Sequence, residues 1–202
     1  MSRKKRVVKK KINIINEYKK SWKYLKDSKK FIYWIIGIFF FFFLVGIFIP
    51  APTFLYNQIM DFIKKLLAET NGLSQFPLIS YILFNNLKST FFVILLGTFF
   101  GIFPIISAIA NGYVLGFVSL LSIQNGGILT LWRLFPHGIF EMPAVFISLG
   151  LGLKLGFFPF QKDKLKSLKN NLISSLKVFI LIVVPLLLIA GIIEGTLMIF
   201  VK

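Results

Sequence analysis

The sequence predicts an all-α polytopic membrane protein, a helix bundle of about five transmembrane helices with one interrupted helix and a surface amphipathic helix. The first reason is composition. Hydrophobic residues make up 56% of the chain and aromatic residues 17%, and the mean hydropathy is +0.81, whereas soluble domains are about 45–50% apolar. The second reason is that the apolar residues form runs of about the 20 residues that a membrane-spanning helix needs. A water-soluble fold is therefore excluded.

Basic charge is concentrated at the N-terminus. The chain has a net charge of +17, of which +11 lies in residues 1–30, and it has no cysteine. Because this tail adjoins an apolar run, we interpret it as a juxtamembrane segment, attracted to anionic lipid headgroups of the bilayer by about 1 kcal/mol per charge. Tyr18, Trp22 and Tyr24 in the tail are typical of a membrane interface. We expect no nucleic acid partner.

The first predicted span is 31–49, an uncharged run that ends at Pro50. The segment 51–89 contains no predicted span. Within it, Leu55, Ile59 and Leu66 recur at helical spacing, charged residues occupy the other face, and Asn71 begins a turn. This pattern indicates an amphipathic helix lying on the membrane surface.

Four further spans are expected toward the C-terminus. They cover about 90–110, which Pro104 interrupts, then 111–125, 128–158 and 178–201, and the run 128–158 is broken by Pro136, Gly138 and Pro143. The predicted organisation is thus a basic cytoplasmic tail, 1–30, followed by a transmembrane domain, 31–202.

The positions of the positive charges predict the topology. The polar segment 161–177 carries a net charge of +4, and basic loops stay in the cytoplasm. If the tail and this segment lie on the same side, an even number of crossings separates them. We therefore expect a multi-pass protein of the cell membrane with its N-terminus in the cytoplasm and its C-terminus outside.

Four of the ionisable residues in the apolar runs are candidates for a shared site. Arg133, His137 and Glu141 are spaced i, i+4 and i+8, and Glu194 lies in the last span. An ionisable group in mid-membrane costs at least about 2.5 kcal/mol, so it usually faces the bundle interior and has a partner. We expect these four residues to form an intramembrane polar cluster. The pattern leaves open whether the cluster is structural or functional.

Catalytic and metal chemistry have weak support. His137, Glu141 and Glu194 would be the ligands of a metal site, but there is neither a second histidine nor a cysteine. No G-x-S-x-G motif marks a nucleophile. We therefore predict no catalytic residue, no bound metal and no cofactor.

Amides and glycines form the remaining patterns. Asn85, Asn86 and Asn111 lie beside apolar runs, where they either cap helix ends, the interpretation that we favour, or contribute amides to the polar cluster. Several glycines are four residues apart, as at Gly97 and Gly101 and at Gly112 and Gly116. Such spacing is typical of close helix packing in membranes.

Four motifs together resemble the stage II sporulation protein M family over about residues 83–202. They are Asn85-Asn86, Asn111-Gly112 with Gly116, the stretch P-H-G-I-F-E-M-P-A at 136–144, and Ile192-Ile193-Glu194-Gly195. The resemblance implies a multi-span membrane protein. In sporulating bacteria a member of this family scaffolds cell-wall-degrading enzymes, and relatives occur in organisms that do not sporulate. The tail and the segment 51–89 contribute nothing to the resemblance.

The leading functional hypothesis is therefore a scaffold or assembly component of a membrane complex, with other membrane proteins as partners. The alternative is a transporter, or an ion-conducting or proton-conducting component that uses the His/Glu cluster. An intramembrane hydrolase is the third hypothesis. Non-enzymatic function is favoured.

Overall fold

The computed structural model describes residues 13–200, with side chains for all of these except 132–140, 195 and 197–200. No strand occurs in this part of the chain, which confirms the all-α prediction. The elements in order are α1 (Ile14–Asp27), α2 (Lys29–Phe48), α3 (Thr53–Thr70), α4 (Gln75–Leu96), α5 (Ile102–Gly126), η1 (Ile128–Leu134), α6 (Phe135–Gly156), η2 (Phe158–Phe160), α7 (Lys164–Val178), η3 (Phe179–Val183) and α8 (Val184–Phe200).

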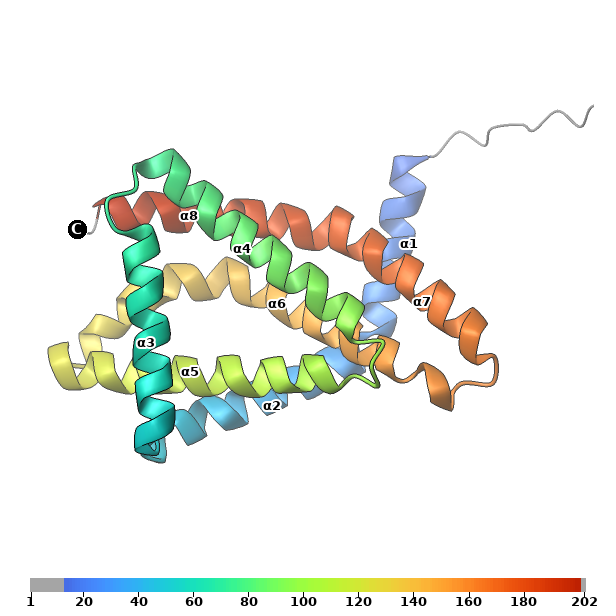
Figure 1. Ribbon diagram of the computed structural model, residues 1–202. Helices are drawn as coiled ribbons and strands as arrows, with labels where there is room; N and C mark the ends of the chain where they lie inside the picture. The colour runs from blue at the N-terminus through green and yellow to red at the C-terminus, as the bar shows by residue number, and fades with distance from the viewer. Residues whose placement is uncertain (1–12, 201–202) are drawn as a thin grey trace, which may run out of the picture.

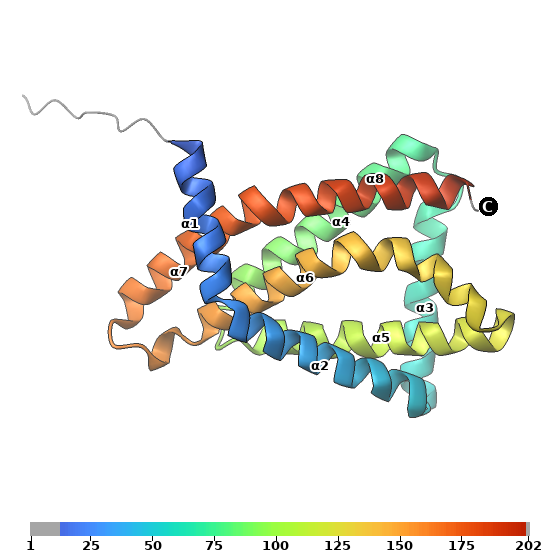
Figure 2. The same cartoon turned by 180° about the vertical axis from the view of Figure 1, so that it is seen from behind.

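The long apolar helices are arranged as a membrane-spanning bundle. Within the described residues, four segments are long and apolar enough to cross a bilayer: Lys29–Phe48, Gln75–Leu96, Ile102–Gly126 and Lys164–Glu194. Helix α6 is a further apolar helix of 22 residues. These helices run back and forth, so that α1 and the α6–α7 connection lie at one end of the bundle and the C-terminus lies at the other (Figures 1 and 2).

Helix α6 forms the centre of the packing. On one side Ala144, Leu151 and Leu155 join a buried cluster with α4, η3 and α8. On the other side Phe146, Leu149 and Leu153 are buried against α2, α4 and α5. Because α6 contributes to both clusters, its apolar side chains are shielded on two faces.

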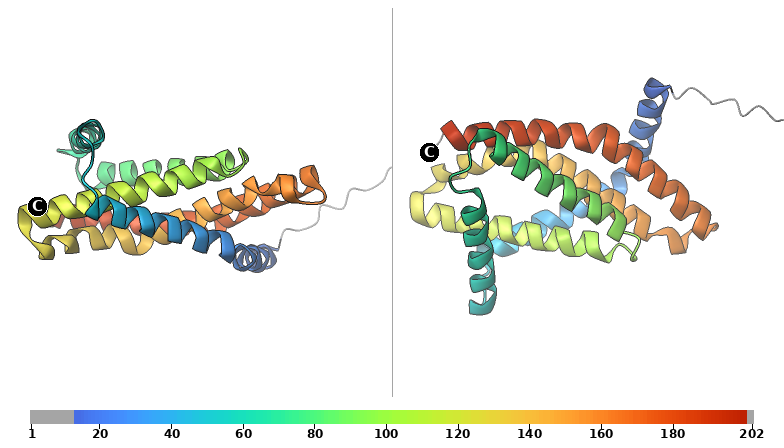
Figure 3. Two further views of the ribbon diagram at one scale, coloured as in Figure 1. Left: turned by 90° about the horizontal axis from the view of Figure 1, so that it is seen from below. Right: turned by 45° about the horizontal axis from the view of Figure 1, so that its top comes forward.

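Helix α3 lies across the end of the bundle opposite α1 (Figure 3). Ile59 is its buried residue, and Tyr56 contacts Phe117 of α5 with ring centroids 5.6 Å apart. The helix ends at Thr70 with Asn71 as its C-cap, and Gly72 takes a φ of +80°, a left-handed conformation that favours glycine. The amphipathic helix expected in 51–89 is thus present.

The break between the second and third apolar helices differs from the prediction. Helix α4 begins at Gln75 rather than near residue 90, and the turn to α5 lies at 97–101 rather than between 110 and 111. Gly101 takes a φ of +71° at this turn. Pro104 lies in the first turn of α5, where its missing N–H removes no helical hydrogen bond. Pro104 therefore starts a helix and does not interrupt one.

Glycines permit close helix contacts, as their spacing indicated. A Cβ atom on Gly112 or Gly116 of α5 would overlap the carbonyl oxygens of Phe39 or Phe43 in α2. A Cβ on Gly97, beside the α4–α5 turn, would overlap the backbone of Gly152 in α6. In both places two backbones are in direct contact, which only a residue without a side chain allows.

The last apolar helix begins earlier than predicted. The polar segment 161–177 is largely helical because α7 starts at Lys164 and continues through η3 into α8. The η3 segment is a π-helix in which the N–H of Val184 donates to the carbonyl of Phe179. Pro185 follows directly and has no N–H to donate. The wider turn therefore lets the helix pass the proline without ending.

Candidate functional site

Two carboxylates lie in the interior of the bundle. Glu141, on α6, is 7% exposed and Glu194, on α8, is 6% exposed. The two helices pack against each other along a shared cluster that includes Ala144 of α6 and Leu187 of α8. Because α6 and α8 run in opposite directions (Figure 1), Glu141 and Glu194 both lie beyond this cluster toward the end of the bundle that holds the C-terminus. Both are shielded from lipid, as ionisable groups in a membrane should be.

Of the two basic members of the predicted cluster, one lies in the same helix as Glu141 and the other lies before that helix. Arg133 belongs to η1, a 3₁₀-helix, whereas His137 is in the first turns of α6, four residues before Glu141. A 3₁₀-helix has 3.0 residues per turn instead of 3.6, so the i, i+4, i+8 series does not run along one continuous α-helix. The side chains of Arg133 and His137 lie outside the described residues, and their place in the cluster stays a prediction.

The amides are not at helix ends. Asn85 and Asn86 lie in the interior of α4, and Asn111 lies in the interior of α5. The side-chain amide of Asn111 donates to the carbonyl of Ser107, 2.8 Å away in the preceding turn. The capping interpretation was therefore wrong, because the breaks in the helices lie elsewhere. Asn85 is exposed.

A second polar cluster joins α1, α6 and α7, and its central residue was missed in the sequence. Lys154 Nζ donates to Ser28 Oγ over 2.9 Å and lies 3.8 Å from the centre of the Tyr24 ring. Ser28 Oγ in turn donates to the carbonyl of Tyr24. The Tyr24 hydroxyl donates to the carbonyl of Asn171 and lies 3.4 Å from Ser175 Oγ. Burial raises the pKa of Tyr24 to about 12.

The sequence contained a signal for this junction, because Lys154 is a cation near the end of an apolar run. The side chain bridges α6 to the residue between α1 and α2. We expect a desolvated cation over an aromatic ring to contribute up to about 2 kcal/mol. The cluster therefore fixes the basic helix α1 to the bundle.

A polar groove between α3 and α4 was also missed. Its volume is about 800 Å³, and Glu69, Tyr81, Asn85 and Lys88 are among the residues that line it. The Tyr81 hydroxyl donates to Glu69 Oε2, which links α4 to α3. Lys88 is exposed, and within the part of the chain that the structure describes no carboxylate pairs with it. The sequence signal was a lysine and two asparagines within four residues, which the prediction had placed outside a span.

Among the described residues, no group of three or more His, Cys, Asp or Glu side chains is placed to hold a metal ion. The polar groups that the described part of the structure adds to the candidate site are two buried carboxylates, Glu141 and Glu194, and the exposed Lys88.

Comparison with known protein families matches residues 14–197 to Stage II sporulation protein M. The chain belongs to the stage II sporulation protein M family. The match extends the resemblance seen in the sequence from about residue 83 back to residue 14. Helices α1 and α3, in which the sequence motifs showed no resemblance, are therefore part of the family's shared region. No curated protein and no solved structure matched this chain.

The first helix of this family member is tied to α7 by an ion pair. The Glu17 carboxylate pairs with Lys177 and with Lys20, the latter at 2.8 Å. Hydrogen bonds from Lys177 and Lys20 lower the pKa of Glu17 to about 2. Together with the Tyr24 contacts, this pair holds α1 across the start of the last long helix (Figure 2).

Proposed function

We propose that this family member is a non-enzymatic membrane scaffold that assembles with another membrane protein through the polar face of α4. The observation that carries the proposal is Lys88 together with Asn85, both exposed within an apolar helix long enough to span a bilayer. A lysine at the centre of such a helix costs about 2.5–3.5 kcal/mol on insertion scales. A partner helix that covers it would remove this cost.

The depth of Lys88 supports a protein partner. Lys88 lies 13 residues after Gln75 and eight before Leu96, which correspond to about 20 Å and about 12 Å along the helix. Side chains on a helix point toward its N-terminus, so the ammonium group is directed toward Asn85 and away from the nearer end. A partner helix with a carboxylate would pair with Lys88 and accept a hydrogen bond from Asn85.

Photocross-linking in intact membranes tests the scaffold proposal. A photoreactive residue at Asn85 should give a discrete protein adduct, and Lys88→Leu should abolish the adduct without changing the amount of folded protein. Ile106 of α5, also exposed, is the control position and should give no discrete adduct. Equal labelling at both positions, or an adduct that survives Lys88→Leu, would contradict the proposal.

Transport is the second candidate function, and the buried carboxylates favour it. Glu141 and Glu194 lie on adjacent helices, and α8 follows directly from the π-helix η3; such turns occur frequently at functional sites. Purified protein in liposomes distinguishes the two candidates. A scaffold produces no proton or cation flux, whereas a transporter produces a flux that Glu141→Gln abolishes.

We also propose that the protein lies in the cell membrane with its basic end in the cytoplasm, where the tail meets anionic lipid. Residue 13 and the connection from α6 to α7 lie at the same end of the bundle (Figure 1). Both adjoin lysine-rich segments, and basic segments are retained on the cytoplasmic side.

A further inference from the structure

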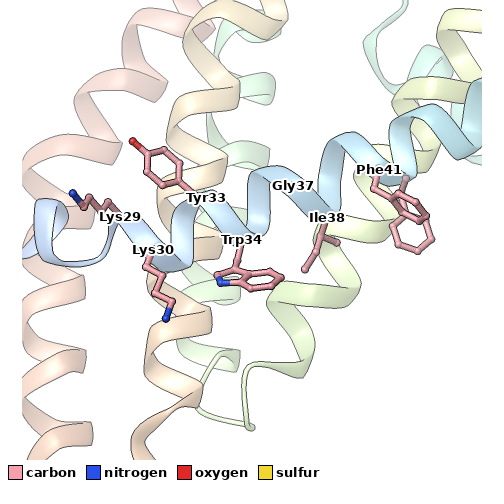
Figure 4. A pocket seen from close by; sticks show the side chains of 8 residues that line it. Lys29, Lys30, Tyr33, Trp34, Gly37, Ile38 and Phe41 are labelled. Atoms are coloured by element: carbon pink, nitrogen blue, oxygen red, sulfur yellow. The ribbon is translucent and has the colours of Figure 1, made fainter.

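A groove runs along the outer face of α2, at the end of the bundle that carries α1. Its volume is about 530 Å³, and it is lined from Lys29 and Lys30 through Tyr33 and Trp34 to Phe41 and Phe42. Figure 4 shows Lys30, Trp34 and Ile38 directed to one side of the helix, with Lys29 and Tyr33 directed to another. Tyr33 and Trp34 are 67% and 62% exposed.

The side chains that line the groove change from charged to apolar along α2. The two ammonium groups lie at the start of α2, the amphipathic rings follow one turn later, and the remaining wall is apolar. From Lys30 to Phe41 the helix rises about 16 Å, which is about half of a hydrocarbon core of about 30 Å. The groove therefore has the length of one leaflet, and it changes from charged to apolar along that length as a phospholipid does.

Gly37 provides space at the middle of the groove. A Cβ atom at this position would meet nothing within 4 Å, in contrast to the glycines that lie between helices. The notch lies beside Trp34 and Ile38 (Figure 4). An acyl chain can lie in this notch while Tyr33 and Trp34 donate hydrogen bonds near the headgroup.

We propose that the α2 groove is a binding site for one anionic phospholipid of the leaflet next to α1. Lys29 and Lys30 bind the phosphate, Tyr33 and Trp34 contact the glycerol region, and an acyl chain lies over Gly37 toward Phe41. This site is separate from the diffuse attraction of the basic tail, and it depends neither on the scaffold nor on the transport proposal.

Native mass spectrometry of the delipidated full chain tests the site with phosphatidylglycerol and phosphatidylcholine. One phosphatidylglycerol should bind with higher affinity than the others and in preference to phosphatidylcholine. Lys29→Gln/Lys30→Gln should weaken this event roughly 30-fold, since each charge contributes about 1 kcal/mol and 1.4 kcal/mol corresponds to a factor of ten. The control Lys19→Gln/Lys23→Gln removes two exposed charges from α1 and should leave the affinity for this phosphatidylglycerol unchanged.

A steric pair of variants tests the notch with all charges intact. Gly37→Leu should abolish the high-affinity event, whereas Gly37→Ala should keep it, and both substitutions raise helix propensity. Glycerol phosphate should not compete, because it lacks the acyl chain. Equal losses in the two double-lysine variants would indicate diffuse attraction and overturn the proposal, as would equal binding of both lipids or an unchanged Gly37→Leu variant.

Discussion

The ammonium group of Lys154 lies 3.8 Å from the centre of the Tyr24 ring, so that a cation from the central helix α6 is held by an aromatic ring of α1. Removing either group should loosen α1. We expect Lys154→Met to lower the free energy of unfolding by about 1–2 kcal/mol, through loss of the cation–π contact and of the bond to Ser28. Thermal unfolding in detergent measures this effect. Lys162→Met, at an exposed position, should have no effect, and equal changes would contradict the assignment.

The Glu17 ion pair should make the docking of α1 depend on pH. The pKa of Glu17 is lowered in the folded protein from its ordinary value of 4.5 to about 2. The stabilisation is therefore present above about pH 5 and is lost as the pH falls toward 2. Because the chain has no cysteine, spin labels at Lys23→Cys and Asn170→Cys can report the α1–α7 distance. The distance distribution should broaden on acidification.

Glu17→Gln provides the control for this pH dependence. It removes the titrating group, so the distribution in that variant should already be broad at pH 7 and should change little between pH 5 and pH 2. A narrow distribution at pH 2 in the unsubstituted chain would contradict the role of Glu17.

The topology predicts which positions share a side of the membrane. Cysteines at Asn13 and Asp163 lie at one end of the bundle, whereas cysteines at Asn71 and Asn125 lie at the other (Figures 1 and 2). In intact cells a membrane-impermeant thiol reagent should label Asn71→Cys and Asn125→Cys but neither of the other two. Labelling that separates Asn13 from Asp163 would contradict an even number of crossings between them.

The contact between α2 and α5 predicts a strong glycine effect. Gly116→Ala places a methyl group on the carbonyl oxygen of Phe43, and overpacking of this kind costs about 1–3 kcal/mol. The matched control is Gly191→Ala in α8, where the added Cβ meets the Leu83 Cβ at 3.5 Å, an ordinary contact. The control should be neutral or slightly stabilising in thermal unfolding. If both substitutions destabilised the protein equally, the contact of α2 with α5 would not be closer than an ordinary helix contact, and the prediction would be contradicted.

Substitutions of the buried Glu141 test whether its carboxyl group only forms hydrogen bonds or takes part in proton or cation chemistry. If its carboxyl group only accepts and donates hydrogen bonds, Glu141→Gln should be milder than Glu141→Leu, since an amide keeps polar contacts that leucine cannot make. Recovery of folded protein and the cross-linked adduct at position 85 are the measurements. Equal functional loss in both variants with unchanged folding would favour proton or cation chemistry.

The sequence was sufficient to predict a helix where the pattern of apolar and charged residues lies within that helix. The apolar run of α2 and the alternation of apolar and charged residues in α3 predicted both helices. The breaks were harder to locate, because a proline or an Asn-Gly pair has different consequences in different settings. Pro104 lies in the first turn of α5, where its missing N–H is harmless, and Gly112 continues α5 because it packs on Phe39.

By itself, the sequence determined that this chain is a helical membrane protein with two acidic residues in apolar runs, because hydropathy and charge are properties of each residue. Tertiary structure decided which polar groups meet. The contacts of Lys154 with Tyr24 and Ser28 join residues more than 120 positions apart. The packing of α4 against its neighbours leaves Lys88 exposed. Such relationships arise from the crossing of helices, and spacing along one helix does not reveal them.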